Sequence, residues 1–313
     1  MRICLIFLLL LLAGKVFSQD TLTFFSPSPD FNNKRFASVV SSQAVSYGGS
    51  LALLSAAWYK DYPQSSFHSF DDSPEWLQMD KAGHLITSWY LGRIGSDMYE
   101  WSGVKKKKAV LYGALSGWTY LTAIETLDGF SDGWGFSWPD FAANTLGTGF
   151  IIGQKILDCN GKSSPLAKGV RGLSLKFSFH QTDFPVYRLS LLGKNLSEQI
   201  IKDYNGQSYW ISFNLSSFMK PETKFPKWLN LAFGYGGENM ISGRDEFVTL
   251  ENGNTIWMER HRQYYLSFDI DLTRIKTKSY FLKTVFETIS FIKIPAPALE
   301  FGKPGTKFHP MYY

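Results

Sequence analysis

The spacing of apolar and polar positions changes near Gly169, from helical before it to alternating after it. The apolar segments before Gly169 are long and rich in Ala, Gly and Ser, which favours helices that pack closely. Four helices are predicted, at residues 36–58, 81–98, 109–127 and 139–157. Pro139 suits the first turn of the last helix, with Ser137 as a cap. The first half therefore predicts a four-helix domain over residues 36–160.

Residues 169–313 form a second region, in which apolar and polar side chains alternate as they do in β-strands. The predicted strands are 173–179, 211–216, 229–235, 264–272 and 289–293. Short helices are expected between them, at 196–204 and 281–286. One face of each strand is apolar and the other is small or polar, which suits a sheet with one covered face or a membrane barrel wall. The fold class is therefore α+β: an N-terminal four-helix unit followed by an antiparallel sheet or partial β-barrel.

Residues 1–18 have the pattern of a secretory signal peptide. Arg2 supplies the positive start, an apolar run follows, and Val16-Phe17-Ser18 suits a cleavage site. Residues 19–35 are expected to form an extended lead-in, because the alternate prolines there exclude a helix. The sequence thus predicts export. No cysteine stands directly after the predicted cleavage site, so no lipid attachment is expected there.

Composition restricts the partners of the mature chain. Its formal net charge falls from +5 to about +3 when Arg2 and Lys15 leave with the signal peptide, which is too little to indicate nucleic acid. Cys159 is the one cysteine left, so no internal disulfide forms. Aromatic residues make up 17% of the chain, and such rings suit membrane interfaces and sheet surfaces. A P-loop and a GxSxG elbow are absent.

The four predicted helices do not fit a protein that crosses the membrane four times. Asp80, Lys81 and His84 interrupt the second helix. After export of the N-terminus, the lysine run 105–108 would also lie outside the cytoplasm, against the positive-inside tendency. We expect instead a bundle on, or partly in, a membrane from its periplasmic side. The lysine run is then a solvated loop or a contact for anionic headgroups.

Two blocks place ionisable residues among the apolar helices, at residues 80–84 and 125–149. Buried charge is costly unless it is paired, so the blocks mark a structural network or a site. Asp80 and His84 are four residues apart and share a helix face, as do Asp140 and Asn144. The candidate catalytic residues are His84, Asp80, Glu125, Asp128 and Asp140. The candidate binding residues are Lys81, Asn144, Trp134 and Trp138.

Three roles stay open for these residues: a structural polar network, a catalytic or metal site, and recognition of lipid or a partner. In the structural role, Lys81 neutralises Glu125 or Asp140. One histidine among carboxylates is a poor zinc set, and no recognised loop spacing supports a hard cation. We therefore assign no metal and leave the cofactor open.

The blocks resemble the YfiM-like family of predicted periplasmic lipoproteins. The matching pieces are Asp80-Lys81-Ala82-Gly83-His84, and the stretches 125–131, 134–137 and 140–147. The strand-rich tail is similar to longer members from Bacteroidetes-type bacteria. A more distant likeness to VanZ-like membrane proteins rests on the first piece and on Asp140, Asn144 and Gly147. The resemblance implies an envelope location and no established activity, and this chain lacks the family's lipid-bearing cysteine.

Two functional hypotheses follow. The first is a non-enzymatic exported envelope protein, associated with the periplasmic side of the outer membrane or embedded in it, with a structural, lipid-binding or partner-binding role. The alternative is an envelope hydrolase that acts on a lipid-linked substrate, with His84 as base and a nearby carboxylate to position it. We expect membrane lipid or an envelope protein as partner, and no nucleic acid. The oligomeric state is open.

Overall fold

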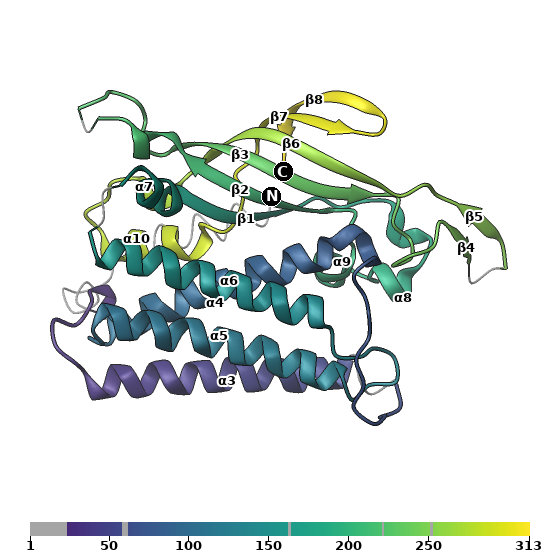
Figure 1. The fold of residues 1–313 in the computed structure, drawn as a ribbon, viewed down its shortest axis with the longest axis horizontal. Coiled ribbons are helices and arrows are strands. Elements are labelled where there is room, and N and C mark those ends of the chain that lie inside the picture. The colour runs from purple at the N-terminus through teal and green to yellow at the C-terminus, as the bar shows by residue number, and fades with distance from the viewer. Residues whose placement is uncertain (1–23, 58–61, 162–163, 221, 251–252) are drawn as a thin grey trace.

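The structure, a computed structural model, describes residues 24–57, 62–161, 164–220, 222–250 and 253–313. The predicted signal peptide over residues 1–18 lies outside the described residues. Long helices come first in the described chain and an antiparallel sheet follows, which confirms the α+β class. Figure 1 shows the helices in one layer and the sheet in another.

The four predicted helices are confirmed, with ends displaced by a few residues. They are α3 (Asn33–Ala57), α4 (Met79–Trp101), α5 (Lys106–Asp128) and α6 (Trp138–Cys159). Ser137 caps α6, because its hydroxyl accepts a hydrogen bond from Asp140 N at 3.1 Å. α4 and α5 touch backbone to backbone at Gly113, where an added Cβ would lie 2.0 Å from Ser96 N. Among the helices that the structure describes, none combines the length and the hydropathy needed to span a bilayer.

Short helices connect the larger elements. The α-helical ones are α7 (Pro165–Gly172), α8 (Leu189–Leu192), α9 (Leu196–Lys202) and α10 (Tyr280–Ile289). The 3-10 turns are η2 (Glu75–Gln78), η3 (Phe184–Val186), η4 (Leu215–Phe218) and η5 (Leu272–Arg274). α9 and α10 confirm the two short helices predicted from apolar spacing.

The sheet has six antiparallel strands in the order β1-β2-β3-β6-β7-β8. Their bounds are β1 (Leu173–Phe179), β2 (Gln207–Asn214), β3 (Leu229–Glu238), β6 (His261–Ile270), β7 (Ala296–Gly302) and β8 (Gly305–Tyr312). β4 (Phe247–Thr249) and β5 (Thr255–Trp257) pair separately. The predicted strand at 289–293 is wrong, since Ile289 ends α10 and the next residues form an isolated β-bridge to Phe177 instead of a strand. The last two strands, β7 and β8, were not predicted.

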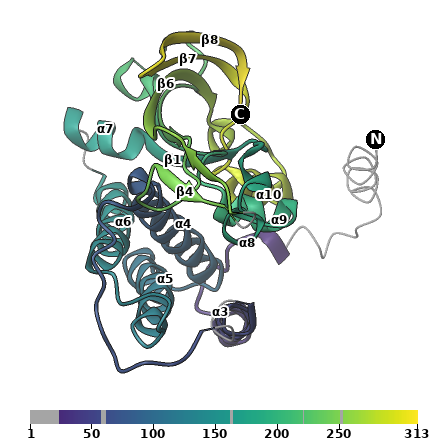
Figure 2. The same ribbon diagram turned by 90° about the vertical axis from the view of Figure 1, so that its right-hand side faces the viewer.

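One face of the sheet is buried, and its side chains are small or polar. Across the central strands, Ser212 lies opposite Ala232, which lies opposite Ser267. All three side chains are buried. Figure 2 shows the sheet curling, with β7 and β8 brought over the earlier strands. Tyr312 on β8 accordingly donates a hydrogen bond to Tyr265 on β6 at 2.8 Å and packs near Trp210 on β2.

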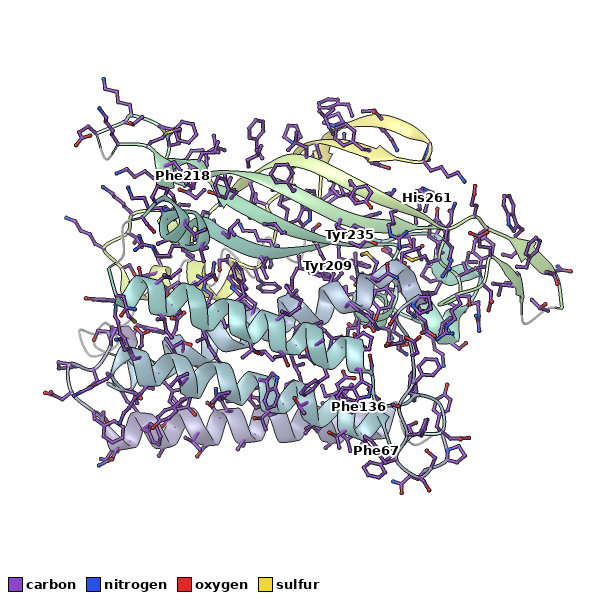
Figure 3. The ribbon with its side chains drawn as sticks, viewed as in Figure 1. Phe67, Phe136, Tyr209, Phe218, Tyr235 and His261 are labelled. Carbon is purple, nitrogen blue, oxygen red and sulfur yellow. The ribbon has the colours of Figure 1, made fainter. Side chains whose placement is uncertain are left out.

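The opposite face is apolar, and only part of it is covered. Near β1, Leu175 and Tyr209 pack against Met79 and Trp89 of the helical half. Figure 3 shows Tyr209 and Tyr235 between the sheet and the helices. Farther from β1 the same face is exposed, and its exposed residues are named here the apolar sheet face: Ile211, Phe233, Tyr264, Phe268, Leu299, Phe301, Phe308 and Met311.

The turn before α4 has an unusual backbone. Trp76, Leu77 and Gln78 have φ values of 47°, 52° and 64°, a left-handed conformation that L-residues avoid. Residues of the sheet half hold this turn. Tyr235 donates a hydrogen bond to the Leu77 carbonyl, and Arg262 donates one to Gln78 Oε1 at 2.6 Å. The left-handed turn therefore depends on contacts from β3 and β6.

Candidate functional site

Three helix ends meet at one end of the bundle (Figure 1). A cavity lined by polar and apolar side chains lies among them. α4 begins there, α5 ends there and α6 begins there. The cavity has a volume of about 230 Å³. Of the predicted site residues, it is lined by Asp80, His84, Glu125, Asp128, Trp134 and Asp140. The convergence expected from the sequence is therefore present in the structure.

Lys81 lies at the centre of a carboxylate cluster. Its ammonium is 3.1 Å from Asp80 Oδ2 and 3.0 Å from Asp140 Oδ2, and it also contacts Asp72 Oδ2. Ser137 donates a hydrogen bond to the other oxygen of Asp72 at 2.7 Å. The lysine thus binds three carboxylates from three segments. Of the two acids that the sequence offered as its partner, it binds Asp140 on α6 rather than Glu125 on α5.

His84 lies one turn farther along α4, between the carboxylates of Asp80 and Glu125. Its Nε2 is 3.7 Å from Asp80 Oδ1, and its Nδ1 is 3.5 Å from Glu125 Oε1. Nδ1 also lies 3.2 Å from Asn144 Oδ1. A proton on Nδ1 would be donated to Asn144 Oδ1, and Nε2 faces Asp80. The imidazole is one-fifth exposed and faces the cavity.

The second half of the chain contributes a tyrosine to the site. Tyr204, which follows α9, donates a hydrogen bond to Asp80 Oδ1 at 2.8 Å. Burial, followed by the Asp80 charge, raises the pKa of the Tyr204 hydroxyl well above its ordinary value of 10.0. Tyr204 therefore stays a hydrogen-bond donor and fixes one oxygen of Asp80.

Asp80 and Lys81 are held in their charged forms. Burial raises the pKa of Asp80, but His84, Lys81 and Tyr204 together outweigh burial and lower it below its ordinary value. For Lys81, burial lowers the ammonium pKa, but the carboxylates of Asp80, Asp140 and Asp72 raise it above 10.5 overall. An ionised Asp80 and a protonated Lys81 therefore form the charged pair at the start of α4.

Glu125 and Asp140 are the least exposed carboxyls of the site, at 2% and 4% of their side-chain surface. Burial raises the pKa of Glu125 from 4.5 to about 8, although the nearby His84 opposes the shift. Burial and the Asp80 charge raise the pKa of Asp140, since one lysine cannot neutralise three carboxylates. The cavity therefore holds carboxyl groups that retain protons near neutral pH, which is typical of sites as well as of buried networks.

Two buried polar atoms in this cluster have no hydrogen-bond partner among the described residues, Asp140 Oδ1 and Asn144 Nδ2. The carboxylate oxygen is the more informative, since its twin, Oδ2, binds Lys81. A buried oxygen without a donor is costly and calls for an explanation. Asp80, His84 and Asp140 also form the one group of possible metal ligands within the described ranges, with ligand atoms within 4.8 Å of one another.

The two tryptophans proposed as binding residues have different surroundings. Trp134 lines the cavity, and its carbonyl lies 2.6 Å from His68 Nε2. His68 thus contacts the loop that carries Trp134. Trp138 is not among the residues that line the cavity; its ring is 63% exposed and packs on Phe136 and Phe141. Figure 3 shows Phe136 and Phe67 in the loops at this end of the bundle.

Several contributors to the site were not predicted. They are Asp72, Glu75, Trp76, Ser137 as a hydrogen-bond donor, and Tyr204. Asp72 lies just before α4 in a loop without periodicity, so only its charge hinted at a role. Tyr204 is 124 residues from Asp80, and no local pattern reports a contact across that distance.

Comparison with known proteins gives one match. Residues 69–153 match the model of a family described as "Predicted periplasmic lipoprotein (DUF2279)". No curated protein and no solved structure matches the chain. The matched segment runs from the loop that carries Asp72 through most of α6, and so includes every site residue named above except Tyr204. Over its cavity-forming helices, the chain is similar to a family of predicted periplasmic lipoproteins, and this similarity supports an exported, periplasmic protein.

Proposed function

We propose that this chain is an exported envelope protein that binds the periplasmic surface of the outer membrane through the apolar sheet face. The YfiM-like assignment forms part of this proposal, with a lipid-binding role in place of a known activity. The observation that carries it is the inverted polarity of the sheet, which encloses polar side chains and exposes apolar ones.

The register makes the inversion clear. Ile211, Phe233, Leu266, Leu299 and Phe308 are successive partners across five strands. Phe233 is 53% exposed and Phe308 60%. The alternate positions enclose an ion pair between Lys176 and Asp269, whose side chains are 1% and 0% exposed. In water, the buried polar side chains of one face and the exposed apolar side chains of the other are both unfavourable. A sheet that faces lipid requires this arrangement.

One end of the apolar sheet face has a basic rim. There β2 and β6 end and β3 begins, since Asn214 pairs with Asn230 and Leu229 with Ile270. The exposed lysines of the adjoining loops are Lys220, Lys224, Lys227, Lys276 and Lys278. Trp228, 41% exposed, lies among them. Lysine and tryptophan beside an apolar surface match the charge and polarity of anionic lipid headgroups.

Vesicle flotation tests this proposal. The purified protein should float with vesicles of phosphatidylethanolamine and phosphatidylglycerol, and a Phe233→Ser/Phe268→Ser/Phe308→Ser variant should not. The matched control is Val45→Ser/Leu53→Ser, because these α3 residues are 75% and 72% exposed. Figure 1 places α3 on the far side of the bundle from the sheet.

Each other outcome contradicts the proposal. Flotation of the sheet variant at the wild-type level would assign binding elsewhere, and loss of flotation in the α3 variant alone would assign it to the helices. If gel filtration shows a dimer for the wild type and a monomer for the sheet variant, while flotation is unchanged, the face is a protein interface. Circular dichroism of all variants verifies folding.

A second candidate function is the hydrolase, and the geometry of His84 favours it. An imidazole at a cavity wall between two carboxyls, one with a pKa of about 8, is suited to acid–base chemistry on a lipid-linked substrate. A His84→Ala variant should then keep its melting temperature and lose its activity in a cell-envelope complementation assay. Parallel loss of both would assign His84 to structure.

A further inference from the structure

We infer that the cavity binds a divalent cation of the zinc or manganese class through Asp80, His84 and Asp140. These three side chains come from the first turns of α4 and α6, and their ligand atoms lie within 4.8 Å of one another. Ligand atoms around one such ion are separated by about 3–4 Å. A small inward movement of the three side chains therefore suffices.

His84 is already oriented as a ligand. Asn144 Oδ1 lies 3.2 Å from Nδ1, and in the tautomer with the proton on Nδ1 it accepts the hydrogen bond while Nε2 keeps a free lone pair. Nε2 is 3.7 Å from Asp80 Oδ1, a spacing at which both atoms reach one ion. Metal-bound histidines usually donate their second N–H in this way, and the donor bond fixes the ring.

Each of the two aspartates has one oxygen that does not bind Lys81, and on Asp80 that oxygen also accepts a hydrogen bond from Tyr204 at 2.8 Å. Lys81 binds Oδ2 of Asp80 and Oδ2 of Asp140, at 3.1 Å and 3.0 Å. Oδ1 of Asp80 faces His84, and Oδ1 of Asp140 is buried without a partner among the described residues. This oxygen is the second observation that points to a ligand, because a metal ion bound in place of the carboxyl proton would give it a partner.

The charge of the cavity favours an additional cation. Six carboxyl groups line it: Asp72, Glu75, Asp80, Glu125, Asp128 and Asp140. Lys81 contacts three of them, and Arg244 pairs with Glu75 at 3.0 Å. A divalent ion next to His84 would add positive charge beside Asp80 and Asp140, which share one lysine with Asp72.

The donor set indicates the class of ion. One imidazole nitrogen with two carboxylate oxygens suits zinc or manganese better than calcium, which prefers six to eight oxygens. Three protein ligands leave a coordination position open toward the cavity. The sequence argued against zinc because it offers one histidine, and the geometry adds the free Asp140 oxygen that the sequence could not show.

Isothermal titration of the chelator-treated protein with ZnCl₂ and with MnCl₂ tests the inference. One ion should bind per chain, and Asp140→Asn and His84→Ala should each lower the affinity at least about tenfold. Asp140→Asn keeps the size of the side chain, and circular dichroism verifies that both variants fold. Electron paramagnetic resonance of bound Mn²⁺ gives a readout that does not depend on heat.

Two matched controls separate this site from other groups. His309→Ala removes a histidine that lies 2.6 Å from Glu300, far from the cavity, and should leave binding unchanged. Asp128→Asn removes a cavity carboxyl outside the ligand group and should have little effect. Absence of stoichiometric binding would overturn the inference. So would binding that survives His84→Ala and Asp140→Asn but is lost in His309→Ala.

Discussion

Lys176 on β1 and Asp269 on β6 form an ion pair that the curled sheet encloses completely. The ammonium is 2.5 Å from Asp269 Oδ2, and the side chains are 1% and 0% exposed. Lys176 also donates to the Ile270 carbonyl at 2.8 Å, and Ser212 donates to Asp269 Oδ2 at 2.6 Å. The charges are therefore paired and hydrogen-bonded, the condition under which buried charge is tolerated.

Removing one member of this pair should be strongly destabilising. We expect Asp269→Ala to lower the free energy of unfolding by about 3–5 kcal/mol, since it leaves the Lys176 ammonium buried and uncompensated. Urea unfolding measures the change. Asp97→Ala is the control, because its pair with Lys155 has side chains 35% and 23% exposed and should contribute under about 1 kcal/mol. Similar losses in both variants would contradict the assignment.

The packing of α4 on α6 predicts opposite effects at two neighbouring glycines. A Cβ at Gly147 would lie 2.1 Å from the Leu85 carbonyl oxygen, so Gly147→Ala should cost about 1–3 kcal/mol. At Gly149 a Cβ meets nothing within 4 Å, and Gly149→Ala should stabilise the helix by about 0.5–1 kcal/mol. Thermal unfolding of the two variants compares them directly. Equal effects would mean that the two helices are not in contact at Gly147.

Glu125 should make stability fall as pH rises. Its pKa of about 8 in the folded protein exceeds the ordinary 4.5, so the folded state holds a proton that the unfolded state has released between these values. The stabilisation is complete below pH 4.5 and decreases by at most about 1.4 kcal/mol per pH unit up to pH 8. Glu125→Gln should remove this decrease, as measured by urea unfolding from pH 5 to pH 9. An unchanged slope in the variant would exclude Glu125 as its source.

The basic rim should make membrane binding depend on salt. Lys224→Gln and Lys227→Gln should each weaken binding to vesicles that contain phosphatidylglycerol by about fivefold, since a lysine near an anionic surface contributes about 1 kcal/mol. Added salt should reduce the difference. Lys106→Gln, at the start of α5 in the helical half, is the control. A larger effect at Lys106 than at the rim would assign the headgroup contact to the bundle.

The helices and the central strands were readable from the sequence because each covers a regular apolar pattern. The four long helices and β1 were predicted within a few residues. β7 and β8 were not predicted because Pro297 and Pro310 interrupt their alternating patterns. β8 is an edge strand, where proline is tolerated. The alternation at 289–293 was misleading, since Ile289 belongs to the apolar side of α10.

The core of the candidate site was predicted from helical spacing, but its partners from elsewhere were not. Asp80 with His84, and Asp140 with Asn144, share faces because four residues complete about one helical turn. Asp72 lies in the loop before α4, and Tyr204 lies two residues after the end of α9. Tertiary packing alone brings them to the site. The orphaned Asp140 oxygen is a fact of geometry and has no counterpart in the sequence.

The left-handed turn at Trp76, Leu77 and Gln78 makes the two halves of the chain one folding unit. Each such residue costs about 1–2 kcal/mol, and the bonds that offset this strain come from Tyr235 and Arg262. A fragment that stops after α6 would lack those bonds and let the turn relax. The first turn of α4, with Asp80 and Lys81, would then leave its position. We therefore expect the helical half to depend on the strands, and the segment that is similar to the family of predicted periplasmic lipoproteins not to keep this site when it stands alone.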